Sequence, residues 1–147
     1  MPDDSAPPET LDAPRGARAR ALAAVYLVVL FISTHMPSPP RLQILTIWDK
    51  FTHLSAYASL TFAVLIGWEL TTGRLQPKHY FAVWFAGTFY AAFDELTQIP
   101  VGRHADMHDW LADVIGILLG MVAFGVGRVW IYRIFVPTSP LAAWKQR

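Results

Sequence analysis

Acidic, basic and amide side chains gather in three short segments of an otherwise apolar chain. Within each segment most of them lie three or four residues apart, so on a helix they would share one face. Carboxylates crowded beside a histidine can act as general acid and base or bind a cation. The candidate site consists of Asp49, Lys50, His53 and Tyr57 in the first segment, Asp94, Glu95 and Gln98 in the second, and Arg103, Asp109 and Asp113 in the third.

Four apolar segments must position these residues, and their lengths suit membrane-spanning helices. We expect helices at about 21–34, 48–71, 78–99 and 108–133. The uncharged cores of the last three give only about 22 Å of helix, against a hydrocarbon layer of about 30 Å. The flanking acids must therefore lie at or just below the lipid interface and face the bundle. With 54% hydrophobic and 16% charged residues, the composition predicts an all-α integral membrane four-helix bundle.

The chain divides into a tail, a membrane domain and a second tail. Residues 1–19 combine four prolines with acids and few large apolar side chains, which is typical of disorder. Residues 20–135 form the membrane domain, and residues 136–147 form the second tail. The run 21–34 follows three arginines as a signal peptide would, but it lacks a cleavage pattern and more spans follow it. We interpret it as an uncleaved first helix.

Lysine and arginine set the expected orientation, because cytoplasmic loops near membrane spans are enriched in them. Of the 12 such residues, nine lie in the tails, in the turn between the second and third helices or at the neighbouring helix ends, and three lie on the other side. Both termini are therefore expected in the cytoplasm, with the polar segments facing outward. The predicted location is the inner (cytoplasmic) membrane, which the chain crosses several times.

Small residues four apart predict where membrane helices pack closely. One such stripe is Ser55, Ser59, Ala63 and Gly67 on the second helix, and the other is Ala112, Gly116 and Gly120 on the fourth. We expect both stripes to face the bundle. Gly116 and Gly120 could instead form a homodimer contact, and the sequence leaves the oligomeric state open.

Composition also limits the partners. The net charge of +1 comes without a basic stripe with interleaved aromatic residues, so the lipid bilayer is an expected partner and nucleic acid is not. The sequence has no cysteine, which excludes disulfides, a thiolate nucleophile and cysteine-ligated zinc. His104 and His108, beside Asp106 and Asp109, could form a metal site, but this pattern is more typical of a solvated loop. No metal is therefore assigned, and the cofactor is unknown.

The ordered set of motifs resembles the VanZ-like family, named after an accessory glycopeptide-resistance protein that lowers susceptibility to teicoplanin. The similar residues are Asp49-Lys50-x-x-His53-x-x-x-Tyr57, Asp94-Glu95-x-x-Gln98, Pro100, Gly102-Arg103, Asp109 and Gly116-x-x-x-Gly120, between about Trp48 and Gly125. Two departures are a Gln98 to Arg103 spacing one residue shorter than usual and Asp113, where many members have asparagine. The resemblance implies a bacterial cell-envelope protein with a role in glycopeptide tolerance, a form of antibiotic resistance.

Two functions remain open for the polar cluster. In the first, the chain binds or protects an envelope component, either a lipid-linked cell-wall precursor or a glycopeptide, without catalysis. In the second, the chain is an enzyme that modifies a lipid or peptidoglycan headgroup, with Asp49, His53, Asp94, Glu95 and Asp109 as an acid–base or metal-assisted centre. A transporter is disfavoured, because the charges gather at one end and no carboxylate relay crosses the membrane.

Residues of the last polar segment have different expected roles. Arg103 is expected to neutralise Asp94 and Glu95, although it could instead dock a phosphate or carboxylate. Asp106 is assigned to the exposed loop outside the cluster, so Asp106→Ala should be tolerated. The side chains expected to approach one another closely are His53, Glu95, Arg103 and Asp109.

Overall fold

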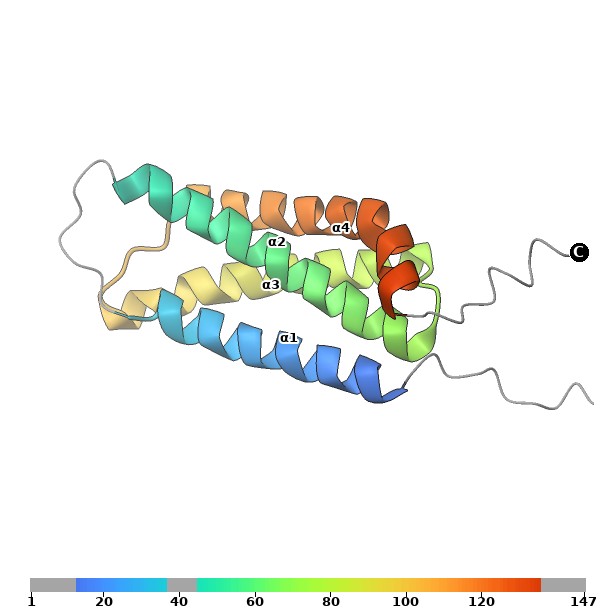
Figure 1. Ribbon diagram of the computed structural model, residues 1–147. Helices are drawn as coiled ribbons and strands as arrows, with labels where there is room; N and C mark the ends of the chain where they lie inside the picture. The colour runs from blue at the N-terminus through green and yellow to red at the C-terminus, as the bar shows by residue number, and fades with distance from the viewer. Residues whose placement is uncertain (1–12, 37–44, 136–147) are drawn as a thin grey trace, which may run out of the picture.

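Four α-helices form the bundle in the computed structural model, which describes residues 13–36 and 45–135. They are α1 (Ala13–Thr34), α2 (Leu45–Thr72), α3 (Pro77–Gln98) and α4 (Met107–Phe135), with a short 3-10 turn, η1 (Ile99–Val101), after α3. Successive helices run in opposite directions, so the start of α1 and the end of α4 lie at the same end of the bundle (Figure 1). The prediction of an all-α fold with four helices is confirmed.

α1 begins earlier than the sequence analysis predicts. Its first residues are Ala13 and Pro14, and proline suits the first turn of a helix because the N–H that it lacks would have no partner there. Alanine and arginine, which favour helix, fill much of the segment as far as Arg20. The predicted disordered tail 1–19 is therefore wrong from residue 13 onward. Residues 1–12 and the predicted tail 136–147 lie outside the described residues.

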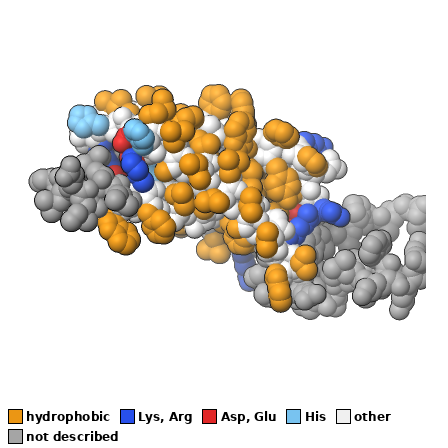
Figure 2. Space-filling model, turned by 90° about the horizontal axis from the view of Figure 1, so that it is seen from above, with side chains coloured by type: hydrophobic (Ala, Val, Ile, Leu, Met, Phe, Trp, Pro, Cys, Tyr) orange, Lys and Arg blue, Asp and Glu red, His pale blue; other side chains and the backbone are white. Residues whose placement is uncertain are grey.

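Three helices in the described part of the chain are long and apolar enough to cross a membrane, namely Arg15–Thr34, Trp48–Thr72 and Met107–Trp130. α3 is not in this set, and its 22 residues carry three charged side chains near its ends. Many large apolar side chains point outward from the bundle. Figure 2 shows such side chains over the middle of one face, with charged and histidine side chains toward its ends. This distribution is that of a multi-pass membrane protein.

α2 is the central helix, because it packs along both α1 and α4, whereas α3 lies mainly against α4. The backbones of α2 and α4 approach closely at two glycines. A Cβ atom added at Gly116 would meet the backbone carbonyl of Leu54, and one added at Gly120 would meet that of Ala58. The stripe predicted on the fourth helix therefore lies against α2, as close packing of membrane helices requires.

The stripe predicted on the second helix faces the bundle only in part. Gly67 lies against the backbone of Arg20 in α1, and Ser55 and Ala63 are half-buried. Ser59 is exposed, so its predicted place inside the bundle is wrong. The physical reason is that α2 packs against neighbours on two sides, and one stripe with a four-residue spacing cannot describe both contacts.

One apolar layer fixes the helices relative to one another just below the polar end. It contains a residue from each helix, namely Leu30, Tyr57, Ala91 and Ile117. Each of these is four residues, or about one helical turn, from a polar residue of the same helix: Thr34, His53, Glu95 and Asp113 respectively. The packing of this layer therefore sets which polar side chains meet in the next turn.

Candidate functional site

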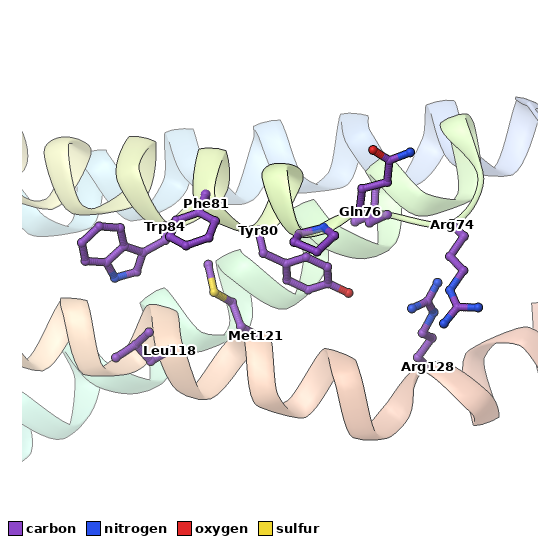
Figure 3. A pocket seen from close by; sticks show the side chains of 10 residues that line it. Arg74, Gln76, Tyr80, Phe81, Trp84, Leu118, Met121 and Arg128 are labelled. Carbon is purple, nitrogen blue, oxygen red and sulfur yellow. The ribbon is translucent and has the colours of Figure 1, made fainter.

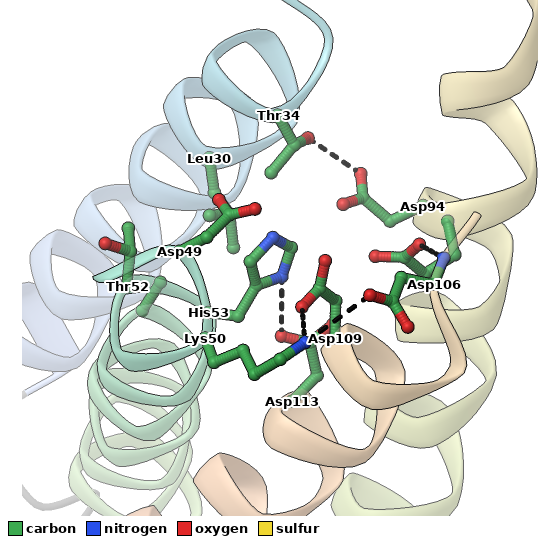
Figure 4. Close-up of polar contacts among 12 residues, drawn as sticks. Leu30, Thr34, Asp49, Lys50, Thr52, His53, Asp94, Asp106, Asp109 and Asp113 are labelled. Atoms are coloured by element: carbon green, nitrogen blue, oxygen red, sulfur yellow. Dashed lines mark hydrogen bonds and ion pairs between the residues drawn. The ribbon is translucent and has the colours of Figure 1, made fainter. Parts of the chain in front are cut away.

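The polar residues singled out in the sequence come together at the end of the bundle opposite the start of α1 and the end of α4 (Figure 4). They lie at the start of α2, at the end of α3 and at the start of α4, which antiparallel helices bring to the same end. The fully or almost fully buried side chains are His53, Asp94, Glu95, Gln98, Asp109 and Asp113. Buried polar groups require partners, so their hydrogen bonds define how the site is built.

Two sets of contacts join α2 to α4. His53 Nδ1 lies 3.0 Å from Asp113 Oδ1, and both side chains are buried. Lys50 Nζ donates to Asp109 Oδ1 at 2.9 Å and to Asp106 Oδ2 at 3.4 Å. Lys50 is partly exposed while Asp109 is buried, so the lysine covers the cluster on its outer side.

Glu95 connects α3 to this pair of helices. Its Oε2 atom accepts the backbone N–H of Asp106 at 2.9 Å. Its Oε1 atom is buried and has no hydrogen-bond partner in the described part of the chain. One ligating atom from each of His53, Glu95 and Asp109 lies within 4.8 Å of the other two. Three of the four side chains expected to approach one another closely are thus brought together.

The end of α1 also contributes to the site, although no sequence motif assigns it there. Thr34 Oγ1 donates to Asp94 Oδ1 at 3.1 Å. The next residue, His35, makes a hydrogen bond through Nε2 to Thr97 Oγ1 at 3.0 Å, and its Nδ1 lies 3.8 Å from Asp94 Oδ1. The available signal is the polar run Ser33-Thr34-His35, which directly follows the apolar run of the first helix.

Arg103 does not neutralise Asp94 and Glu95 as predicted. Gly102 has a φ of 80°, and this left-handed conformation turns the chain back after η1. The guanidinium of Arg103 then donates to the carbonyl of Thr34 at 2.8 Å and lies 4.0 Å from Asp49 Oδ1. Thr34 at the end of α1 contacts both groups instead, because its carbonyl accepts from Arg103 and its hydroxyl donates to Asp94. Asp94 instead accepts hydrogen bonds from Thr34 and, at 3.3 Å, from Gln98.

Asp106 is a structural part of the site rather than a free loop residue. It directly precedes α4, and its Oδ1 atom accepts the backbone N–H of His108 at 2.9 Å, which makes it the N-cap of that helix. This bond and a second one from the His108 imidazole hold the pKa of Asp106 at about 2. Asp106 lies in the loop as predicted, with 32% of its side chain exposed, but its predicted place outside the cluster is wrong, because it contacts Lys50.

Asp106→Ala is expected to lower the free energy of unfolding by about 0.5–2 kcal/mol, which is the usual cost of losing such a cap. Thermal unfolding of the purified protein in detergent micelles measures this effect. His104→Ala is the control, because His104 is an exposed side chain in the same loop. Equal stability of the two variants would show that the cap contributes nothing.

The alternative metal site in the loop is not supported by the arrangement of its histidines. His104 is exposed. His108 is 76% exposed, and its Nδ1 atom lies 3.0 Å from Asp106 Oδ1. Among the described residues, the three acid or histidine side chains close enough to hold an ion are His53, Glu95 and Asp109.

Tyr57 connects the polar cluster to an apolar groove. The groove has a volume of about 710 Å³ and is lined mainly by apolar side chains of α1, α2 and α3, among them Leu27, Leu60, Val64 and Ala86, and by Ile117 of α4. Tyr57 and Tyr90 line it as well, and the hydroxyl of each is buried without a hydrogen-bond partner in the described residues. Tyr57 is one helical turn from His53, and Tyr90 is one turn from Asp94.

A second groove lies between α3 and α4 near the opposite end of the bundle (Figure 3). It has a volume of about 940 Å³, and Tyr80, Trp84 and Met121 are among its lining residues. Arg74 and Arg128 stand at one end of it, and Arg128 Nε lies 2.7 Å from Glu69 Oε1. The two ends of the molecule thus differ in charge, with most of the acids at one end and this arginine pair at the other.

Comparison with known proteins identifies the family of this chain. No curated protein and no solved structure matches the chain. The model of the VanZ/LLP1 family matches residues 21–135, a range that contains α2, α3 and α4 whole and α1 from residue 21. The match extends beyond the segment in which the motifs were recognised and includes the whole polar cluster. The chain therefore belongs to the VanZ/LLP1 family.

Proposed function

We propose that the chain binds the headgroup of a lipid-linked envelope component at the polar cluster, while the lipid chain of that component occupies the apolar groove. The observation that carries this proposal is the position of Tyr57, which lines the groove and lies one turn from His53. A ligand with both a polar and an apolar part fits this combination. A lipid-linked cell-wall precursor is such a ligand.

Unpartnered polar atoms in the cluster support a ligand with hydrogen-bonding groups. Asp113 Oδ2, Arg103 Nε and the Tyr57 hydroxyl are buried without a hydrogen-bond partner in the described residues. A buried polar group without a partner costs about 1–3 kcal/mol. A bound headgroup that makes these hydrogen bonds would recover part of that cost.

A second candidate function is catalysis on the headgroup. The buried pair His53–Asp113 favours it, because a histidine that is held by a carboxylate is a common general base. In this reading the chain modifies a lipid or peptidoglycan headgroup, and the groove serves to position the substrate.

Profiling of cells with and without the gene distinguishes the two candidates. Lipid-linked precursors and peptidoglycan would be measured by mass spectrometry, and susceptibility to teicoplanin would be measured in parallel. Complementation with wild type, with His53→Gln and with Glu69→Gln completes the design. Glu69 is a buried acid that pairs with Arg128 at the other end of the bundle, so Glu69→Gln controls for the loss of a buried charge away from the cluster and should keep the wild-type profile.

Each outcome has a distinct meaning. A changed amount of a precursor, or increased teicoplanin susceptibility without the loss of any compound, would support binding or protection. A compound that is absent without the gene and with His53→Gln would establish an enzyme. If neither the compounds nor the susceptibility changed, the proposed function would be wrong.

We also propose that both termini lie in the cytoplasm and that the polar cluster faces outward from the cytoplasmic membrane, because nine of the 12 lysines and arginines belong to the side of the termini. A fusion of alkaline phosphatase after Arg147 is expected to be inactive, and a fusion of green fluorescent protein at the same point is expected to fluoresce. An active phosphatase fusion would reverse the topology. The control is phosphatase inserted after Ala105, between α3 and α4, which should be active.

A further inference from the structure

We propose that the polar cluster holds one divalent transition-metal ion, Zn²⁺ or Mn²⁺, bound by His53, Glu95 and Asp109. These residues come from α2, α3 and α4 respectively, and all three are buried. Each offers one ligating atom, and the three atoms lie within 4.8 Å of one another. Nitrogen and oxygen ligands about 2.1 Å from one zinc ion lie at most about 4.2 Å apart, so small side-chain rotations complete the site.

An independent observation points to a cation at this place. Glu95 is only 5% exposed, and its Oε1 atom has no hydrogen-bond partner in the described part of the chain. The second oxygen of the neighbouring Asp113 is also buried and unpartnered. Carboxylate oxygens accept hydrogen bonds or bind cations, and a buried one that does neither is costly.

The charge balance of the cluster supports the same conclusion. Its buried carboxylates are Asp94, Glu95, Asp109 and Asp113, whereas its permanent cations are Lys50 and Arg103. With neutral histidines, as metal binding requires of His53, the buried acids outnumber these cations. Burial of excess negative charge near the lipid is costly, and a divalent ion removes two charges of that excess.

The ligand types select the class of metal. One imidazole with two carboxylates suits Zn²⁺ or Mn²⁺, whereas Mg²⁺ and Ca²⁺ are usually held by oxygen ligands alone. In metal sites a ligating histidine commonly gives its other ring N–H to a carboxylate, which fixes the ring and its tautomer. The hydrogen bond between His53 Nδ1 and Asp113 leaves Nε2 as the ring nitrogen that can bind a metal.

Lys50 competes with the ion for Asp109. Its Nζ atom contacts Asp109 Oδ1 at 2.9 Å, but it also reaches Asp106 at 3.4 Å and is 40% exposed. When a metal binds Asp109, Lys50 can keep its contact with Asp106. Removal of the ammonium group should therefore raise the affinity for the metal. If Lys50 only supported the structure of the cluster, its removal would lower that affinity.

The metal would also explain how an acidic site receives an anionic headgroup. Lipid-linked precursors carry phosphate, which carboxylates repel, and a bound cation turns that repulsion into attraction. This consequence rests on the proposed function. The metal site itself does not rest on it and is tested without any lipid ligand.

The test uses the full chain in detergent micelles after treatment with EDTA. Titration with Zn²⁺ is followed by calorimetry, and the bound metal is counted by mass spectrometry after dialysis. Wild type is expected to bind one equivalent. Glu95→Gln should lower the affinity at least about 10-fold, and Asp113→Asn should lower it by about 10–100-fold through its hydrogen bond to His53. Glu69→Gln, which replaces a buried glutamate outside the cluster, should bind as wild type does.

Two further measurements test the metal site. Lys50→Met is expected to raise the Zn²⁺ affinity several-fold. Circular dichroism of each variant before titration separates a lost site from a lost fold. The metal site would be overturned if folded wild type bound no Zn²⁺ or Mn²⁺, or if Glu95→Gln and Glu69→Gln bound equally well. Metal binding without any change in the precursor profile would instead leave the site intact and refute the proposed function.

Discussion

His53→Ala is expected to lower the free energy of unfolding by about 3 kcal/mol or more, because removing one partner of a buried hydrogen-bonded pair leaves the Asp113 carboxylate without compensation. The charge left behind is Asp113, whose side chain is completely buried. Its Oδ1 atom would lose the contact at 3.0 Å with His53 Nδ1, and its Oδ2 atom has no partner in the described residues to begin with. Unfolding by sodium dodecyl sulfate in mixed micelles measures this loss.

Two variants test whether the pair is the cause. The double variant His53→Ala/Asp113→Ala no longer has the buried Asp113 carboxylate that lacks a partner. It should therefore be more stable than the sum of the two single effects predicts. Lys50→Ala also removes the partner of a buried acid, Asp109, but the position of the ammonium group is 40% exposed and admits water, so this variant should cost less than His53→Ala. Strict additivity of the two single changes would show that His53 and Asp113 act independently.

The sequence is sufficient to predict that four helices form and at which end of the bundle the site lies. Apolar runs identify the helices, and the antiparallel alternation of the four helices brings the starts of α2 and α4 to the same end as the end of α3. The four-residue spacing of Asp49, His53 and Tyr57 predicted one shared helix face. Tyr57 lies at the inner end of that face and lines the apolar groove.

The partners of individual side chains could not be predicted in the same way. A spacing pattern gives the face of a helix but not its rotation or depth against a neighbour. The spacing pattern therefore does not assign the end of α1 to the site, although Thr34 contacts both Asp94 and Arg103. The assignment of Arg103 to Asp94 and Glu95 failed for the same reason, because charge alone does not tell which acids a guanidinium can reach.

Asp106 illustrates a different limit. Its sequence neighbours are polar, and polarity alone predicts an exposed loop. Its role depends on the exact start of α4 at Met107, because only the residue directly before the helix can cap it. Helix ends are the least certain part of a sequence-based assignment. A one-residue shift of the start would have given the cap to another residue.

Gly116→Leu and Gly120→Leu are expected to abolish the folded bundle, because both glycines lie where the backbones of α2 and α4 meet. A Cβ atom at Gly116 would collide with the carbonyl oxygen of Leu54, and one at Gly120 would collide with that of Ala58. Backbone atoms of a helix cannot rotate away as a side chain can. The two helices would have to separate, and α2 also holds α1 in place.

A graded series makes this prediction quantitative. Gly116→Ala adds only the Cβ atom and should cost about 1–3 kcal/mol, as overpacking of a close contact does. Gly125→Ala lies on the same helix, where an added Cβ would meet nothing within 4 Å, so it should gain about 0.5–1 kcal/mol through the better helix propensity of alanine. The difference between these two variants isolates the clash from propensity, because the chemical change is identical. If both were equally stable in detergent unfolding, α4 would pack through a different face. The layer that joins Tyr57 to Ile117, and with it the meeting of His53 and Asp113 one turn above, would then lose its structural basis.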